Sequence, residues 1–178
     1  GQVYRDGMAA LAKTKTAADL PLLVRYEKHL ERSEQWAEVF SVLGIRYDVS
    51  NSDAERAFID AKRRWVLSER MADSNEAWDF YRALHESKPE DRDVLENLAR
   101  IAGARGERAL AIQFLDGLSN IAATAEDAAR YQRRIAEVHE ANEANDKARS
   151  AYLRALDHQP DDTDALGGLK RIANAEKD

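Results

Sequence analysis

Apolar residues recur along this chain at intervals of three and four positions, which is the period of an amphipathic α-helix. Combined with helix start signals, the period predicts helices over residues 53–72, 74–87, 90–104, 107–120, 125–142, 145–158 and 162–175. Ser52, with Glu55 three residues later, is typical of a capping box at the first of these starts. Only 8 Gly and 3 Pro interrupt the chain. We therefore expect an all-α protein.

The first 51 residues follow this period less regularly. A short leading helix is indicated by four apolar residues: Val3, Tyr4, Met8 and Leu11. A helical pair is indicated by two apolar faces: Leu20, Leu23, Tyr26 and Leu30, then Trp36, Val39, Phe40 and Leu43. We expect the pair to end at Gly44, because glycine is favoured just after a helix, and residues 45–51 to form an irregular connection. The predicted division is a leading helix and degenerate pair over residues 1–51 and a regular array over residues 52–178.

The array carries a recurring pattern of an alanine, an aromatic residue or leucine four positions on, and another apolar residue three further. It occurs three times: Ala77, Tyr81, Leu84; Ala111, Leu115, Leu118; and Ala148, Tyr152, Ala155. The alanines are 34 and 37 residues apart, a spacing typical of helical-pair solenoids. An alanine lets two helix axes approach closely, and the larger residue fills the space beside it. The pattern predicts repeats over residues 58–91, 92–125 and 129–162, followed by a capping helix over 163–175.

With these positions in place, the segment covering about residues 53–178 resembles tetratricopeptide repeats. First helices carry a large residue followed by a small one at Leu98 with Ala99 and at Ile135 with Ala136, and Gly106 occupies an intra-repeat turn. The first repeat departs from the family pattern, with Arg64 and Trp65 in these slots. The resemblance implies a right-handed superhelix of antiparallel helix pairs that binds other molecules rather than transforming them.

In such arrays the binding surface is usually the inner face, lined by the first helices. Projecting that face gives eight candidate groove residues: Lys62, Arg63, Arg70, Asn97, Arg100, Arg130, Arg133 and Arg134. Seven are cations, and they face three carboxylates: Asp93, Glu96 and Glu137. The chain as a whole is acidic, with a formal net charge of −6, which argues against non-specific nucleic-acid binding. We therefore expect a net-basic groove on an acidic protein.

Tetratricopeptide domains that dock the acidic C-terminal tails of chaperones use a clamp of lysine, asparagine and arginine side chains. The resemblance places that clamp on five positions: Lys62, Val66, Asn97, Arg130 and Arg134. Valine cannot donate a hydrogen bond to a carboxylate, and Arg130 stands where the family has lysine. The implied ligand is an acidic peptide or a C-terminal carboxylate. The competing interpretation is that these cations only keep an exposed helix face solvated.

Catalytic and cofactor chemistry has no support in the sequence. The chain has no Cys, which excludes thiolate catalysis and cysteine-based zinc sites within it, and its 4 His lack metal-ligand spacing. No phosphate-binding glycine loop or nucleophile elbow is present. No apolar stretch approaches the roughly 18 residues of a membrane span. We expect no enzyme activity, cofactor or metal, and interpret the chain as a scaffold that binds a protein or peptide.

Three alternatives stay open. The first is a nucleic-acid-binding helical repeat, which the arginine-rich segment 130–134 supports. The second is a regulatory domain of a larger enzyme, which the start at Gly1 rather than Met supports. Self-association through unpaired apolar helix faces at one end of the array is the third. The sequence identifies neither the partner nor the compartment.

Overall fold

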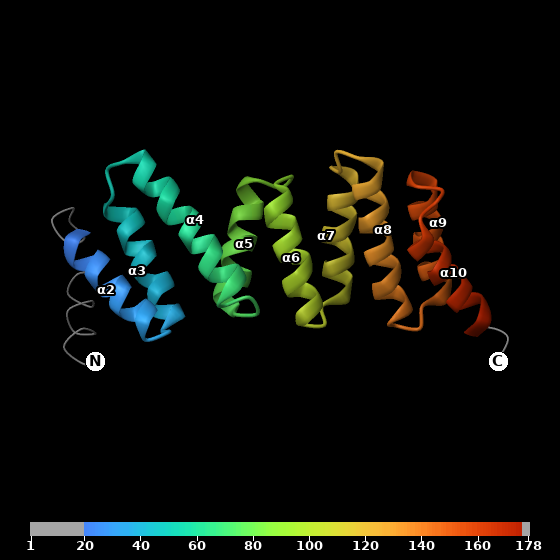
Figure 1. The fold of residues 1–178 in the computed structure, drawn as a ribbon, viewed down its shortest axis with the longest axis horizontal. Helices are drawn as coiled ribbons and strands as arrows, with labels where there is room; N and C mark the ends of the chain where they lie inside the picture. The colour runs from blue at the N-terminus through green and yellow to red at the C-terminus, as the bar shows by residue number, and fades with distance from the viewer. Residues whose placement is uncertain (1–19, 176–178) are drawn as a thin grey trace. The chain divides into compact units, whose positions relative to one another are not determined.

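The computed structural model describes residues 20–175, and every regular element in that range is an α-helix (Figure 1). The helices are α2 (Leu20–Arg32), α3 (Trp36–Val49), α4 (Asp53–Glu69), α5 (Asn75–Ser87), α6 (Arg92–Ala104), α7 (Arg108–Asn120), α8 (Ala125–Glu140), α9 (Asn145–His158) and α10 (Thr163–Ala175). The seven helices expected from residue 53 onward are confirmed, with each end within three residues of its predicted position. The predicted leading helix lies outside the described residues.

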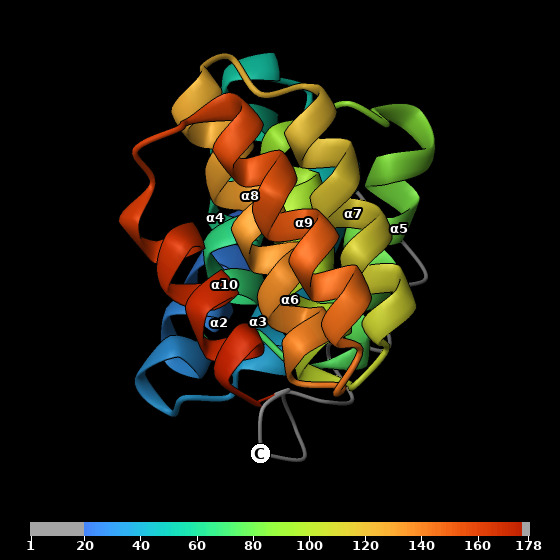
Figure 2. The same ribbon diagram turned by 90° about the vertical axis from the view of Figure 1, so that its right-hand side faces the viewer.

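The chain divides into two compact units, Gly1–Ala77 and Trp78–Asp178. In the first unit α2 packs on α3 and α3 packs on α4. In the second unit each helix from α6 to α10 packs on the next, and α10 also reaches α8, as the grouping of α8, α9 and α10 in Figure 2 shows. Helices that pack on their neighbours in chain order are compatible with a helical repeat. The units are groups of packed helices, a different division from the repeat boundaries predicted from sequence.

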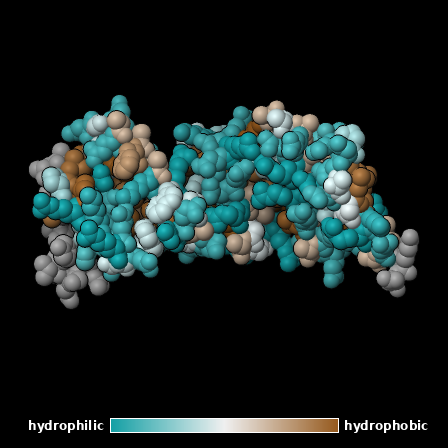
Figure 3. Space-filling model, viewed as in Figure 1, coloured by the Kyte–Doolittle hydropathy of each residue, from teal (hydrophilic) through white to brown (hydrophobic). Residues whose placement is uncertain are grey.

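The surface turned toward the viewer in Figure 3 is mostly hydrophilic, with small hydrophobic areas. The apolar residues that set the helical period are instead buried. In the first unit the core includes Leu23, Leu30, Val39 and Leu43, all at most 1% exposed. The predicted amphipathic faces of α2 and α3 are therefore the faces that meet.

The expectation that the helical pair ends at Gly44, with an irregular connection over residues 45–51, is wrong. Helix α3 continues to Val49, because its last turn presents Arg46 and Val49, each 6% exposed, on the same buried side as Val42. The Arg46 guanidinium is bonded to Glu27 at 2.5 Å, so a charged residue occupies a core position. These contacts outweigh the roughly 0.5–1 kcal/mol cost of a glycine within a helix.

Three inter-helix turns share one geometry. Each contains a residue in the left-handed region: Glu34 (φ 56°), Gly106 (φ 72°) and Glu143 (φ 57°). In each, the next amide donates to the carbonyl five residues earlier: Gln35 to Leu30 at 3.0 Å, Glu107 to Ala102 at 2.8 Å, and Ala144 to His139 at 3.0 Å. This is the Schellman motif, which satisfies carbonyls left free at a helix end. The predicted placement of Gly106 in a turn is confirmed, and the pairs α2–α3, α6–α7 and α8–α9 close in the same way.

The alanines of the recurring pattern are buried, as the close approach of paired helices requires. Ala77 and Ala148 are 0% exposed and Ala111 is 2% exposed. The residues four positions on are buried as well: Tyr81 and Tyr152 at 1% and Leu115 at 2%. The apolar period that placed these positions on the inner faces of their helices is thereby confirmed.

Helices α9 and α10 are in close contact at Gly168. A Cβ atom at Gly168 would lie 2.2 Å from Cζ of Tyr152. The same tyrosine hydroxyl donates to Oε2 of Glu140 at 2.7 Å, and Arg171 bonds that carboxylate at 2.9 and 3.0 Å. Burial, with the bond to Glu140, raises the pKa of the Tyr152 hydroxyl. The ring is therefore fixed between α8, α9 and α10.

Gly168→Ala should destabilise the protein by roughly 1–3 kcal/mol, because the added methyl group forces the Tyr152 ring to move. The matched control is Gly167→Ala, whose Cβ would meet only the end of Arg171 at 3.9 Å. That control should stabilise α10 by up to about 1 kcal/mol through helix propensity. Urea unfolding followed by circular dichroism measures both changes. Equal effects of the two substitutions would contradict the described packing.

Glu143→Gly should stabilise the protein by about 1 kcal/mol, because glycine adopts the left-handed conformation without the cost borne by glutamate. Gly106→Ala should destabilise it by about 1–2 kcal/mol for the same reason, since no atom lies within 4 Å of the added Cβ to cause a clash. Thermal unfolding of the two variants tests the shared turn geometry. Destabilisation by Glu143→Gly would argue against it.

Candidate functional site

Three of the eight predicted groove residues lie in the first unit: Lys62 and Arg63 on α4 and Arg70 directly after its end. Lys62 Nζ is 2.5 Å from Glu27 Oε1 and 2.5 Å from Glu31 Oε1. Burial by itself lowers the pKa of Lys62, but the bonds to Glu27 and Glu31 outweigh it and hold that pKa above its ordinary value. Lys62 is therefore engaged within the fold.

Glu27 is the centre of this polar cluster and is only 2% exposed. Its second oxygen accepts from Arg46 at 2.5 Å, and Arg46 also donates to Glu55 at 3.1 Å. Burial opposes the charge of Arg46, yet the bonds to Glu27 and Glu55 outweigh it and raise its pKa. Ser52 Oγ accepts from the Glu55 amide at 3.3 Å, so the predicted cap on α4 is confirmed. The Glu55 carboxylate, instead of returning to Ser52, bonds Arg46 and Ser50.

Three arginines at seven-residue intervals, two on α4 and one capping its C-terminus, lie over aromatic rings of α3. The pairs are Arg56 over Tyr47 at 5.7 Å, Arg63 over Phe40 at 4.7 Å and Arg70 over Trp36 at 5.0 Å. Each is a cation–π contact, because the ring face is negative and the guanidinium positive. Since the rings follow the reverse chain order, the contacts bind two antiparallel helices. Arg63 and Arg70 thus help to hold α3 against α4.

Val66, which the resemblance placed in the clamp, is 0% exposed. It lies seven residues after Ile59, which is also 0% exposed, and both belong to the core of the first unit. The expectation that Val66 is an exposed groove position is therefore wrong. Trp65, on a different side of α4, is 43% exposed and packs edge-on against Trp36, with ring centroids 5.9 Å apart.

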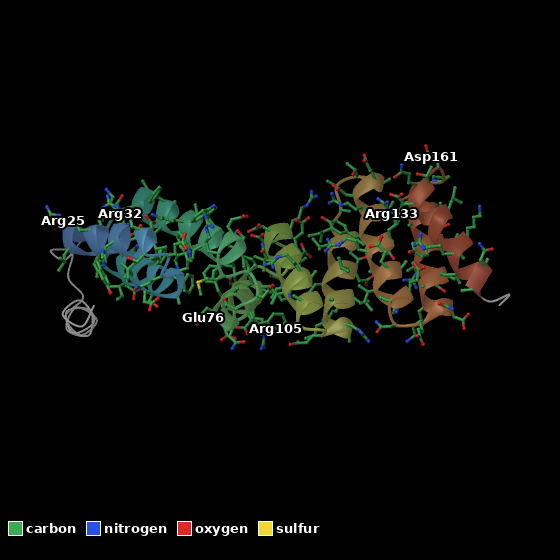
Figure 4. All side chains as sticks on the ribbon, turned by 60° about the horizontal axis from the view of Figure 1, so that its bottom comes forward. Arg25, Arg32, Glu76, Arg105, Arg133 and Asp161 are labelled. Carbon is green, nitrogen blue, oxygen red and sulfur yellow. The ribbon has the colours of Figure 1, made fainter. Side chains whose placement is uncertain are left out.

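The other five predicted residues lie on α6 and α8 in the second unit. Arg130 pairs with Asp127 at 2.9 Å and donates to the Tyr131 hydroxyl at 3.0 Å. Arg133 Nε lies 3.0 Å from Asp162 Oδ2, and its Nη1 contacts Asp164. Figure 4 shows Arg133 on α8 near the turn that carries Asp161. Two more of the predicted groove cations are therefore paired within the fold.

Three other polar bonds between helices share one spacing. In the second unit Arg92 bonds Asp127, and Tyr131 donates to Glu96 at 2.6 Å, each across 35 residues. In the first unit Lys62 and Glu27 are also 35 residues apart. The interval is close to one repeat, so the bonds join corresponding helices of successive pairs. Of the charged groups in these bonds only Glu27 is fully buried, and its cost of burial is offset because it has partners.

Asn97, Arg100 and Arg134 remain beside a hollow on the second unit. Asn97 donates to the Asp93 carbonyl on its own helix at 2.9 Å. Arg134 makes no side-chain hydrogen bond or ion pair with any residue in the described range 20–175. With Glu96, these three residues line a hollow of about 260 Å³.

A larger hollow of about 410 Å³ adjoins the first and shares Arg100 and Arg134 with it. It is formed by residues of α6, α7 and α8, most of them small or apolar: Ala99, Gly103, Ala104, Ala111, Leu115, Val138 and Ala141. Glu137 is the one carboxylate among the residues that line it. We call the two hollows together the α6–α8 groove. It combines an apolar floor with two arginines.

Glu96, a carboxylate at this groove, already accepts hydrogen bonds from neighbouring side chains. Burial favours the neutral form of Glu96, but the hydrogen bonds from Tyr131 and Arg92 outweigh it and lower its pKa. Glu96 is thus a charged acceptor that its neighbours already use. Sequence reasoning placed Asn97, Arg100 and Arg134 on adjoining parts of one surface, and the structure brings these three together. The sequence did not indicate Glu27 or Arg46, because the two lie on different helices and pair across 19 residues.

No protein-family model matches this chain, and a search of curated proteins also gives no match. Within residues 20–175, no three His, Cys, Asp or Glu side chains are grouped so as to hold a metal ion. None of the helices in the described part of the chain has the length and apolar character needed to cross a membrane.

Glu27→Gln should destabilise the protein by about 3–5 kcal/mol, because it removes the buried charge that both Arg46 and Lys62 bond and leaves Arg46 only the more exposed Glu55. The matched control Glu31→Gln removes a more exposed partner of Lys62 and should cost no more than about 1 kcal/mol. Urea unfolding followed by circular dichroism compares the two. A loss below 1 kcal/mol for Glu27→Gln would show that the cluster is not a buried ion network.

Proposed function

We propose that this chain is a non-catalytic scaffold of the tetratricopeptide type that binds a peptide or a partner subunit in the α6–α8 groove. The observation that carries the proposal is the position of Arg134. It lies beside an apolar hollow of about 410 Å³ and makes no polar contact with the described residues, whereas Arg130 and Arg133 on the same helix are paired. An unpaired arginine at an apolar hollow is suited to a ligand that brings both a carboxylate and an apolar group.

The lining supports a peptide rather than a compact cofactor. Small residues such as Ala99, Gly103 and Ala141 leave room for a side chain, and the adjoining hollow extends the surface past Asn97. Arginine binds carboxylates through two parallel hydrogen bonds, which fixes their orientation. The ligand we propose is an acidic or C-terminal peptide whose carboxylate meets Arg134 and Arg100 while a neighbouring apolar side chain enters the larger hollow.

Membership in the tetratricopeptide family is supported by the buried alanines and by the three turns of one geometry. The right-handed superhelix belongs to the same proposal. The nucleic-acid alternative rested on segment 130–134, where Arg130 and Arg133 are paired with carboxylates. Those pairings remove much of the positive charge that phosphate binding requires, so we favour the peptide.

Peptides selected from a displayed library of random C-terminal sequences should include acidic members that bind with an affinity lowered by added salt. Arg134→Gln should weaken these peptides by about tenfold or more, since it removes a charge-assisted hydrogen bond. The matched control Arg108→Gln, an exposed arginine at the start of α7, should leave affinity within about twofold. Isothermal titration measures both. Equal affinity for wild type and Arg134→Gln would remove the groove as the site.

A further inference from the structure

A separate hollow of about 250 Å³ lies among α7, α8 and α9. On α8 it involves Ile135 and His139, whereas the α6–α8 groove involves Arg134 and Val138, so the two hollows are on different sides of that helix. We call it the α7–α9 pocket. Nothing in the proposed groove function accounts for it.

The polar side chains of this pocket are His139, Lys147, Arg154, Asp116 and Ser150. Within the described part of the chain, the side chains of His139, Lys147 and Arg154 make no hydrogen bond or ion pair. The Ser150 hydroxyl is already used, because it donates to the Asp146 carbonyl at 2.9 Å. The pocket therefore gathers two cations and an imidazole whose donors are available, unlike the paired arginines of the neighbouring surface.

The charges that line the α7–α9 pocket indicate the charge of a suitable ligand. Lys147 and Arg154 contribute two positive charges and Asp116 one negative charge, which leaves one positive charge unbalanced. Burial lowers the pKa of His139, and Lys147 and Arg154 lower it further, so the neutral imidazole prevails near neutral pH. A single carboxylate would neutralise the pocket, whereas a dianionic phosphate group would leave excess negative charge beside Asp116.

The shape agrees with an acidic side chain. Ile135, which is 3% exposed, and the half-buried Ile112 contribute an apolar wall, against which the methylene groups of a glutamate can lie. The charged donors, Lys147 and Arg154, come from α9 and lie about two helical turns apart. Arginine and lysine so placed can bind the two oxygens of one carboxylate.

We infer that the α7–α9 pocket binds an acidic side chain of a partner protein, held by Lys147, Arg154 and His139. This site is independent of the α6–α8 groove. It gives the second unit a second point of recognition, on another side of α8.

Binding at this site takes up a proton. In the free protein, Lys147 and Arg154 on α9 repel a proton on His139. A bound carboxylate beside His139 opposes that repulsion. Asp116 on α7 is present in both the free and the bound protein, so it does not contribute to the change. The imidazole pKa therefore rises on binding, and affinity increases as pH falls from about 8 to about 6.

The test uses the whole chain and N-acetylated, C-amidated tetraglutamate as the probe. The His139 imidazole signal, assigned by its loss in His139→Asn, is followed by NMR during titration with the probe and then with pH. We expect a saturable shift and an increase of about half a unit or more in the His139 pKa. Lys147→Gln with Arg154→Gln should weaken binding by about tenfold or more. Arg108→Gln, at an exposed arginine that lines neither hollow, should leave it within about twofold.

Three results would overturn the inference. The first is a His139 signal that does not respond to the probe at about 10 mM, a concentration at which even millimolar affinity would be visible. The second is an equal response in the Lys147→Gln, Arg154→Gln variant. The third is an equal response to neutral tetraglutamine. Circular dichroism confirms that the variants are folded, which is expected because Lys147 and Arg154 are exposed. Failure of the Arg134 experiment would leave this site unaffected, because the two readouts use different residues.

Discussion

Polar bonds between helices about one repeat apart are the constraint on which the surface of this protein depends. Glu27 with Lys62 in the first unit, and Arg92 with Asp127 in the second, span 35 residues each. The first of these bonds satisfies Glu27, which helix packing takes out of water, where an unpaired charge would be costly. Such bonds also decide which cations are left for a ligand. Among the described cations of the second unit, Arg134 lines the groove, and Lys147 and Arg154 line the α7–α9 pocket, without a hydrogen bond or ion pair to another described residue.

Helix α8 connects the two candidate sites. One side of it contributes Arg134 to the groove, and another contributes His139 to the pocket. The helix is held from its far end by Glu140, whose carboxylate binds both Tyr152 of α9 and Arg171 of α10. A helix fixed in this way presents its side chains in a set geometry, so little ordering free energy is lost when a ligand binds.

The sequence predicted the helices from residue 53 onward because their apolar period and caps are local signals. It failed at the end of α3, because the buried Arg46 breaks the apolar pattern while its partner Glu27 is 19 residues away. The same limit applied to the groove. Residue type and spacing placed Arg133 and Arg134 on the right helix, but only the fold brings Asp162 to the first and an apolar hollow to the second. Pairing is a property of distant residues, and a single sequence does not display it.

The most direct test of this account is the NMR behaviour of arginine side chains in the free protein. Rotation about the Nε–Cζ bond and exchange of the Nε proton are slow when a guanidinium is held by carboxylates and fast when it is solvated. The account predicts restrained signals for Arg46 and Arg133 and freely averaged signals for Arg134. A restrained Arg134, or an Arg133 as mobile as Arg134, would contradict the claim that inter-helix bonds decide which cations are available.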